Sequence, residues 1–224
     1  MPTDGFTMRV GRPRKSRQRP RSEFQFTSGA LCLDFANTLE DRPSPQPYDR
    51  IQCYADLLAW SESATILTRR QRLALLRQAS RRPQQAARVF HHAIALRETI
   101  FKIFVAVASK RKPVFTILNA LSHELRRLAQ NLVIIHENDQ FRWAWKRNGN
   151  SLDQILWPVA RSAAELLISD GLQRLKQCAA PDCGWLFLDF GRGRGRRWCE
   201  MKTCGNRWKV REYYKRRRRY EHFA

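Results

Sequence analysis

Four cysteines near the C-terminus have the residue type and the spacing of a metal site. Four residues separate Cys178 from Cys183, four separate Cys199 from Cys204, and fifteen lie between the two pairs. Each short loop can turn two thiolates toward one ion, and the longer insert carries the chain to its other side. We interpret the four thiols as ligands of one structural zinc ion. The alternatives are four unrelated thiols or two disulfides.

Basic residues surround these cysteines. Residues 171–224 contain 15 Lys and Arg against 5 Asp and Glu, and the whole chain has a formal net charge of +22. A cationic excess beside a zinc site favours a partner with a dense row of negative charges, such as nucleic acid. A solvated basic face is the simpler alternative. An anionic membrane surface fits less well, because the basic segments lack a large apolar face.

A small module is expected to position the four thiols. Residues 185–189 have the pattern of a strand, 191–195 of a loop, and 196–198 of the returning strand. Residues 206–219 contain neither Pro nor Gly and predict a helix. A knuckle, a hairpin and a helix whose first turn supplies ligands describe a treble-clef-like finger. Four thiolates close the coordination shell, which argues against zinc-hydroxide catalysis.

The basic side chains of this module are candidate nucleic-acid contacts. The planar fork of arginine can hold a phosphate or the edge of guanine, and phosphate contacts should make the affinity steeply salt-dependent. The candidates lie in or beside the loop and along the helix: Arg192, Arg194, Arg196, Arg197, Arg207, Lys209, Arg211, Lys215, Arg216 and Arg217. Asn206 can contact adenine or tie down the backbone at the helix start, and we favour the second role.

The chain before the cysteines predicts mainly helices. Leu31, Phe35 and Leu39 recur every four residues, and prolines from Pro43 onward should end that helix by Arg42. Apolar residues recur at helical spacings in four further segments, at 51–58, 68–82, 90–108 and 118–128. Thr68 is a good N-cap for the second of these.

Two features interrupt the helical pattern. Residues 132–136 and 140–147 predict a β-hairpin with an aromatic face that includes Trp143 and Trp145, and we expect these tryptophans to be in the core. Ser151 and Gln154 form a capping box that should open a helix kinked at Pro158 and ending at Gly171.

These patterns predict an α+β fold with two domains. A mainly helical N-terminal domain with one β-hairpin should cover residues 23–171, and the treble-clef-like four-cysteine zinc finger with its basic helical tail residues 172–224. Residues 1–22 contain almost nothing apolar and predict a disordered basic arm. Residues 11–15 partly match an AT-hook, although a nonspecific arm is favoured.

Cellular location follows from what the chain lacks. No apolar run approaches the roughly 20 residues of a membrane span, and the basic N-terminus has no signal-peptide segment. We therefore expect a cytoplasmic protein with no membrane partner, in which the thiols stay reduced and ligate metal.

Three polar residues stand out in the helical domain. Asp34 and Asn37 lie one turn apart in an apolar helix, and Arg97 interrupts the buried face of the longest helix. They can form a pocket for a small polar effector, or Asp34 and Arg97 can make an internal ion pair, which we favour. Cys32 and Cys53 are expected to be buried. No nucleophile with a neighbouring base, acid pair or phosphate loop is evident, so we expect no enzyme activity.

Two stretches resemble known families. Residues 197–199 (RWC), followed by Cys204-Gly205-Asn206-Arg207 and Lys209, resemble the CGNR zinc finger, found at the C-terminus of bacterial proteins regarded as transcriptional regulators. Residues 29–38 (GALCLDFANT) and 96–101 (LRETIF) resemble the ABATE domain, described as a stress-induced regulator. The likeness covers about residues 24–215. It implies zinc on the four cysteines and DNA as the partner.

The leading hypothesis is therefore a zinc-dependent DNA-binding transcriptional regulator that responds to stress or to a small-molecule effector. Self-association is compatible with it. The second hypothesis is an RNA-binding or ribosome-associated zinc protein, because a basic module with aromatics also suits structured RNA. The third is a redox switch in which oxidation of the thiolates releases zinc.

Overall fold

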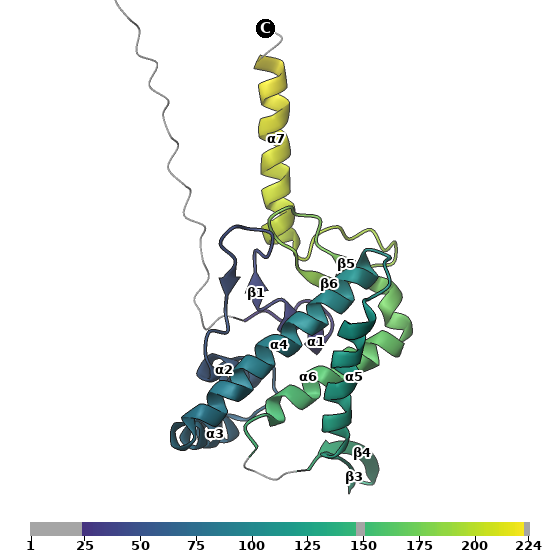
Figure 1. Ribbon diagram of the computed structural model, residues 1–224. Helices are drawn as coiled ribbons and strands as arrows, with labels where there is room; N and C mark the ends of the chain where they lie inside the picture. The colour runs from purple at the N-terminus through teal and green to yellow at the C-terminus, as the bar shows by residue number, and fades with distance from the viewer. Residues whose placement is uncertain (1–23, 147–150, 222–224) are drawn as a thin grey trace, which may run out of the picture.

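The computed structural model describes residues 24–146 and 151–221, so the predicted basic arm at residues 1–22 lies outside it. The fold is α+β and mainly helical, as the sequence predicts (Figure 1). The α-helices in these ranges are α1 (Leu31–Ala36), α2 (Tyr54–Ser63), α3 (Arg69–Arg81), α4 (Pro83–Ala108), α5 (Phe115–Ala129), α6 (Trp157–Ile168) and α7 (Asn206–Glu221). The strands form antiparallel pairs: β1 (Leu39–Glu40) with β2 (Tyr48–Asp49), β3 (Leu132–Glu137) with β4 (Gln140–Trp145), and β5 (Leu175–Gln177) with β6 (Leu186–Leu188).

Helix α4 crosses the body of the molecule (Figure 1). Its buried positions include Ala93, Leu96, Ile100 and Phe104, which recur at intervals of three or four residues and form one apolar face. Helices α1 and α5 pack against α4, and α6 packs against both α1 and α5. The core of the helical part is therefore built around the helix that the sequence predicts to be the longest.

The first helix is shorter than expected. It ends at Ala36, and the chain continues into β1, where Leu39 is paired with Asp49 of β2. The hydroxyl of Thr38 donates to the carbonyl of Phe35 at 2.7 Å, and backbone pairing with β2 then replaces the helical pattern. The helix ends before Arg42, as predicted, but the prediction that Leu39 belongs to it was wrong, because strand pairing with β2 overrides the helical spacing there.

The sequence predicted the start of α3 correctly but not the course and the end of α6. Thr68 caps α3 in a capping box with Gln71, as expected for an N-cap residue. The predicted kink at Pro158 is absent, because α6 begins at Trp157 and proline in the first turn removes no helical hydrogen bond. Helix α6 ends at Ile168, before the expected Gly171, and a 3-10 helix (Asp170–Arg174) follows.

The β3–β4 hairpin forms as predicted but is largely outside the core. Trp145 is half-buried, and its ring centroid lies 5.6 Å from that of Trp157. Farther along the hairpin Trp143 is 52% exposed and Phe141 78% exposed. The expected burial of Trp143 was wrong, because this part of the hairpin lies at the surface, where the guanidinium of Arg161 in α6 is 5.9 Å from the Trp143 ring centroid.

The sheet of β5 and β6 belongs to the main core. Leu175, Leu186 and Leu188 are buried among the side chains of the helical part.

The two cysteines outside the four-cysteine set differ in burial. Cys32 is buried in the core of the helical part as expected, whereas Cys53 is exposed just before α2. Among the described residues, no helix is long and apolar enough to cross a membrane.

Candidate metal centre and nucleic-acid interface

The four predicted ligands meet at one point. Their Sγ atoms all lie within 4.8 Å of one another, with 3.6 Å between Cys183 and Cys199 and 3.5 Å between Cys199 and Cys204. A zinc ion bound at about 2.3 Å in a tetrahedron needs sulfurs about 3.8 Å apart. All four thiols are buried and none forms a disulfide. The cluster therefore fits one structural zinc ion, with no ligand position left open.

The first knuckle is tight and touches the helical part. Cys183 donates its backbone N–H to Ala180, which closes the turn between the first two ligands. Gly184 follows with φ +76°, and a Cβ there would lie 3.2 Å from Cδ of Pro43. Glycine is needed at this position both for the left-handed backbone and for the close approach.

The returning strand predicted at residues 196–198 is absent. Strand β6 pairs with β5 instead, and the 190–195 loop is held by the buried carboxylate of Asp189. This carboxylate accepts from the backbone N–H groups of Gly191 and Arg196 and from Lys176 Nζ. The Lys176 ion pair and these hydrogen bonds lower the pKa of Asp189 to about 2. The Asp189 carboxylate thus accepts hydrogen bonds from backbone N–H groups that would otherwise bond to a neighbouring strand.

The second knuckle leads into α7. A π-helical turn (Met201–Gly205) precedes α7, and a Cβ on Gly205 would collide with Sδ of Met201 and lie 3.1 Å from Trp198. The rings of Trp198 and Trp208 lie 5.4 Å apart in a small apolar cluster that contains the four thiols. This cluster is small, so bound metal supplies much of the stability of the module.

Most of the basic side chains of the module lie on its surface. Helix α7 stands away from the rest of the molecule (Figure 1). Arg192, Arg194 and Arg197 are exposed in the loop. Along the helix the exposed cations within the described part are Arg207, Lys209, Arg211, Lys215, Arg216, Arg217 and Arg218.

Comparison with known families identifies the helical part. The model of the ABATE family, described as "Putative stress-induced transcription regulator", matches residues 29–170. The chain belongs to the ABATE family. The model of the CGNR zinc finger matches residues 174–217, which contain all four cysteines. No curated protein matches the chain. These families are of the regulator and zinc-finger types and are not enzymatic.

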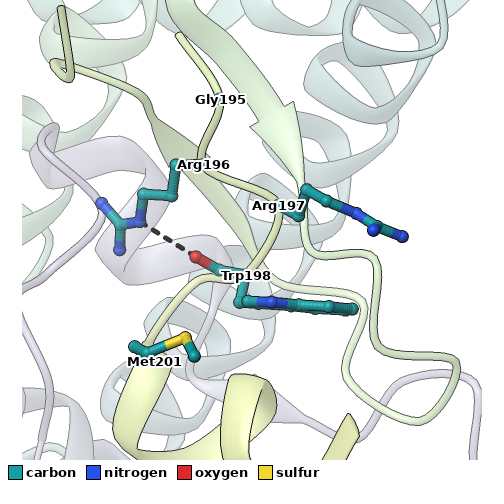
Figure 2. Close-up of a pocket in the computed structure, with 5 residues that line it drawn as sticks. All are labelled: Gly195, Arg196, Arg197, Trp198 and Met201. Atoms are coloured by element: carbon teal, nitrogen blue, oxygen red, sulfur yellow. Dashed lines mark hydrogen bonds between the residues drawn. The ribbon is translucent and has the colours of Figure 1, made fainter. Parts of the chain in front are cut away.

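Within the CGNR finger, some candidate arginines have internal partners. Arg196 donates through Nε to the carbonyl of Trp198 at 2.9 Å (Figure 2). It also donates through Nη2 to the carbonyl of Cys199, and its guanidinium lies over the ring of Phe187. Arg207 and Arg211 both donate to Asp182. These side chains connect parts of the finger to one another.

A shallow pocket lies beside the loop of the CGNR finger. Its volume is about 360 Å³, and it is lined by Gly195, Arg196, Arg197, Trp198 and Met201 (Figure 2). The guanidinium of Arg197 lies over the rings of Trp198 and Trp208, at 5.1 and 5.6 Å from their centroids. The loop therefore presents a cation beside aromatic side chains.

In the ABATE domain, the candidate effector residues have separate internal partners. Asp34 accepts from the backbone N–H of Ser28 at 3.0 Å, and burial raises its pKa to about 6. Arg97 is 2% exposed and makes two hydrogen bonds of 2.7 Å to Asp49 and one to Thr38. The predicted Asp34–Arg97 pair was therefore wrong, because Asp49 is brought to Arg97 by the β1–β2 turn.

Sequence reasoning did not find the residues that join the ABATE domain to the CGNR finger. The side chain of Asn37 forms two hydrogen bonds with the backbone of Leu186, and the carbonyl of Ser28 accepts from Leu188 N at 2.7 Å. An asparagine on an otherwise apolar helix was the only signal of this role, and it does not identify the partner.

Proposed function

We propose that this protein is a cytoplasmic transcription regulator that binds duplex DNA through its CGNR finger. The observation that carries the proposal is the arrangement of α7, a helix that begins at the metal centre, projects from the molecule and has seven exposed Lys and Arg side chains among those that the structure describes. A row of phosphates is the partner that best complements such a helix. The ABATE domain, within proposed bounds of 23–171, would hold the finger at 172–224.

The dimensions of α7 support DNA over RNA as the partner. Its 16 residues span about 24 Å, and an α-helix fits the wide major groove of B-DNA but not the deep, narrow one of A-form RNA. Val210 and Tyr213, which are 51% and 62% exposed, lie one turn apart and can contact base edges. Lys209 and Arg216 would contact phosphates, as would Arg192 and Arg194 in the loop.

The contacts between the two domains support control of the finger by the ABATE domain. Because Asn37 fixes Leu186 and Pro43 packs against Gly184, the finger is held in one orientation on the ABATE domain. A change in the ABATE domain, for example on binding an effector, would then alter the placement of α7. This gives a physical route from a stress signal to DNA affinity.

A salt titration tests the proposal. The zinc-loaded chain is titrated with a 25-base-pair DNA duplex and with an RNA duplex of the same length and sequence, at several salt concentrations. We expect tighter binding to DNA than to RNA. The slope of the logarithm of the binding constant against the logarithm of the salt concentration, the salt slope, should fall in magnitude by about 1 in each of Lys209→Gln and Arg216→Gln, because each variant removes one phosphate contact.

The matched control is Arg161→Gln. Arg161 lies in α6 of the ABATE domain and pairs with Glu165 on the surface, so its loss should leave the salt slope unchanged. Tighter binding to the RNA duplex, or slopes that Lys209→Gln and Arg216→Gln leave unchanged, would overturn the proposal.

A further inference from the structure

Arg207, the last residue of the Cys-Gly-Asn-Arg motif, contacts the metal centre directly. Its Nη2 donates to Sγ of Cys204 at 3.2 Å, and its Nη1 donates to Oδ2 of Asp182 at 3.2 Å. Asp182 immediately precedes Cys183 in the first knuckle, whereas Cys204 belongs to the second. One guanidinium therefore connects the two halves of the ligand set.

The charge of the site explains why a cation is needed there. Four thiolates around a divalent ion carry two net negative charges, and the four cysteines are at most 6% exposed. A buried charge is costly unless nearby charges and hydrogen-bond donors compensate it. Arg207 is the charged side chain that donates to a ligand sulfur in the described part of the chain.

The other residues of the motif have complementary packing roles. Gly205 lies against Met201 and Trp198 where any side chain would collide, and Nδ2 of Asn206 donates to the carbonyl of Lys202 at 3.2 Å. Arg211 lies one turn after Arg207 and donates to both oxygens of Asp182, at 2.8 Å to Oδ2, which also accepts from Arg207, and at 3.3 Å to Oδ1. Two N–H donors of the Arg207 guanidinium are thus already bonded within the finger, to Cys204 and Asp182, before any polyanion approaches.

We infer that Arg207 is a positioning residue of the metal centre: it orients the Cys204 thiolate, compensates its charge, and anchors the first knuckle through Asp182. DNA contacts are left to the outward cations of α7 and the loop. This role does not depend on DNA binding, because every contact that supports it lies within the finger.

Zinc release from the full-length protein tests the inference. Zinc-loaded wild type, Arg207→Gln, Arg207→Lys and Lys209→Gln are mixed with a chromogenic chelator, and the release rate is measured. Residues that hydrogen-bond to a metal ligand typically change metal affinity by about 10–100-fold, so Arg207→Gln should release zinc at least about 10-fold faster. Arg207→Lys keeps the charge and should be intermediate. Lys209→Gln, an exposed neighbour, should match wild type.

Cobalt substitution separates an effect on the thiolate from general destabilisation. A hydrogen bond from a guanidinium stabilises the sulfur lone pair, so its loss in Arg207→Gln should move the sulfur-to-cobalt charge-transfer band to longer wavelength. The band in Lys209→Gln should stay at the wild-type position. If Arg207→Gln does not retain the finger, Asp182→Asn, which leaves Arg207 in place, should still accelerate zinc release.

Two results would overturn the inference. One is a release rate for Arg207→Gln and Asp182→Asn within about twofold of wild type, well below the roughly 10-fold expected when a hydrogen bond to a metal ligand is lost. The other is an unshifted cobalt band in a folded Arg207→Gln. Failure of the DNA proposal would appear differently, as absent duplex binding by wild-type protein whose zinc release still depends on Arg207.

Discussion

Asn37 holds the backbone of Leu186 with both polar atoms of its side chain. Its Nδ2 donates to the Leu186 carbonyl at 2.8 Å, and its Oδ1 accepts from the Leu186 N–H at 2.9 Å. Asn37 follows α1 of the ABATE domain, and Leu186 begins β6 of the finger. The amide thus takes the place of a neighbouring strand at the edge of the β5–β6 sheet and ties the two domains together.

Asn37→Ala is expected to destabilise the protein by about 2–4 kcal/mol, because it leaves a buried donor and a buried acceptor of Leu186 unpaired. The loss is measured as the change in the free energy of unfolding by urea. Asn119→Ala, at an exposed position of α5, is the matched control and should change stability by less than about 0.5 kcal/mol. Equal stabilities of the two variants would contradict the proposed connection.

Asp34 should make stability depend on pH. Burial raises its pKa from 3.8 to about 6, so the folded state binds the proton more tightly than the unfolded state. The stabilisation of the folded state by this tighter proton binding is therefore complete below about pH 4 and is lost as pH rises through 6. The shift corresponds to about 3 kcal/mol.

Asp34→Asn cannot ionise, yet its side-chain oxygen can still accept from Ser28. The variant should lack the fall in stability between pH 4 and 6, measured by thermal unfolding across this range. An unchanged pH profile in Asp34→Asn would assign the titration to another group.

The ion pair between the buried Arg97 and the partly buried Asp49 should matter more than an exposed one. Removing Arg97 leaves Asp49 without its cationic partner, with the backbone N–H of Ile51 still donating to it, and Arg97→Met should cost about 3 kcal/mol. The exposed pair of Arg161 and Glu165 is the control, and Arg161→Met should cost less than about 1 kcal/mol. Urea unfolding of both variants checks this order, and a reversal would show that the pair does not stabilise the ABATE domain.

Removal of zinc should unfold α7 and the two knuckles while the ABATE helices remain folded. An isolated helix of 16 residues with clustered like charges is marginal in water, whereas structural zinc contributes about 10–16 kcal/mol in comparable fingers. Under reducing conditions, chelation should lower the helical circular dichroism and open α7 to trypsin. Adding zinc back should reverse both changes. Retention of the full helical signal at less than stoichiometric metal would contradict this prediction.

The sequence by itself determined the features that depend on local spacing. The two cysteine pairs predicted the metal centre, Thr68 the start of α3, and the alternating residues of 132–145 the hairpin. Each of these depends on residues close together in the chain, where periodicity and ligand reach are nearly the same in any surroundings.

The tertiary structure alone decided which polar groups are partners. Asn37 and Leu186 are 149 residues apart, and Arg97 and Asp49 are 48 apart. The sequence predicted that Arg97 needed an acidic partner and proposed Asp34, but the choice depends on the β1–β2 turn. The same holds for Arg207. Its residue type and its basic neighbours suggested that it binds phosphate, whereas folding places it beside Cys204 and Asp182. A long charged side chain can reach many partners, and only packing in three dimensions selects one.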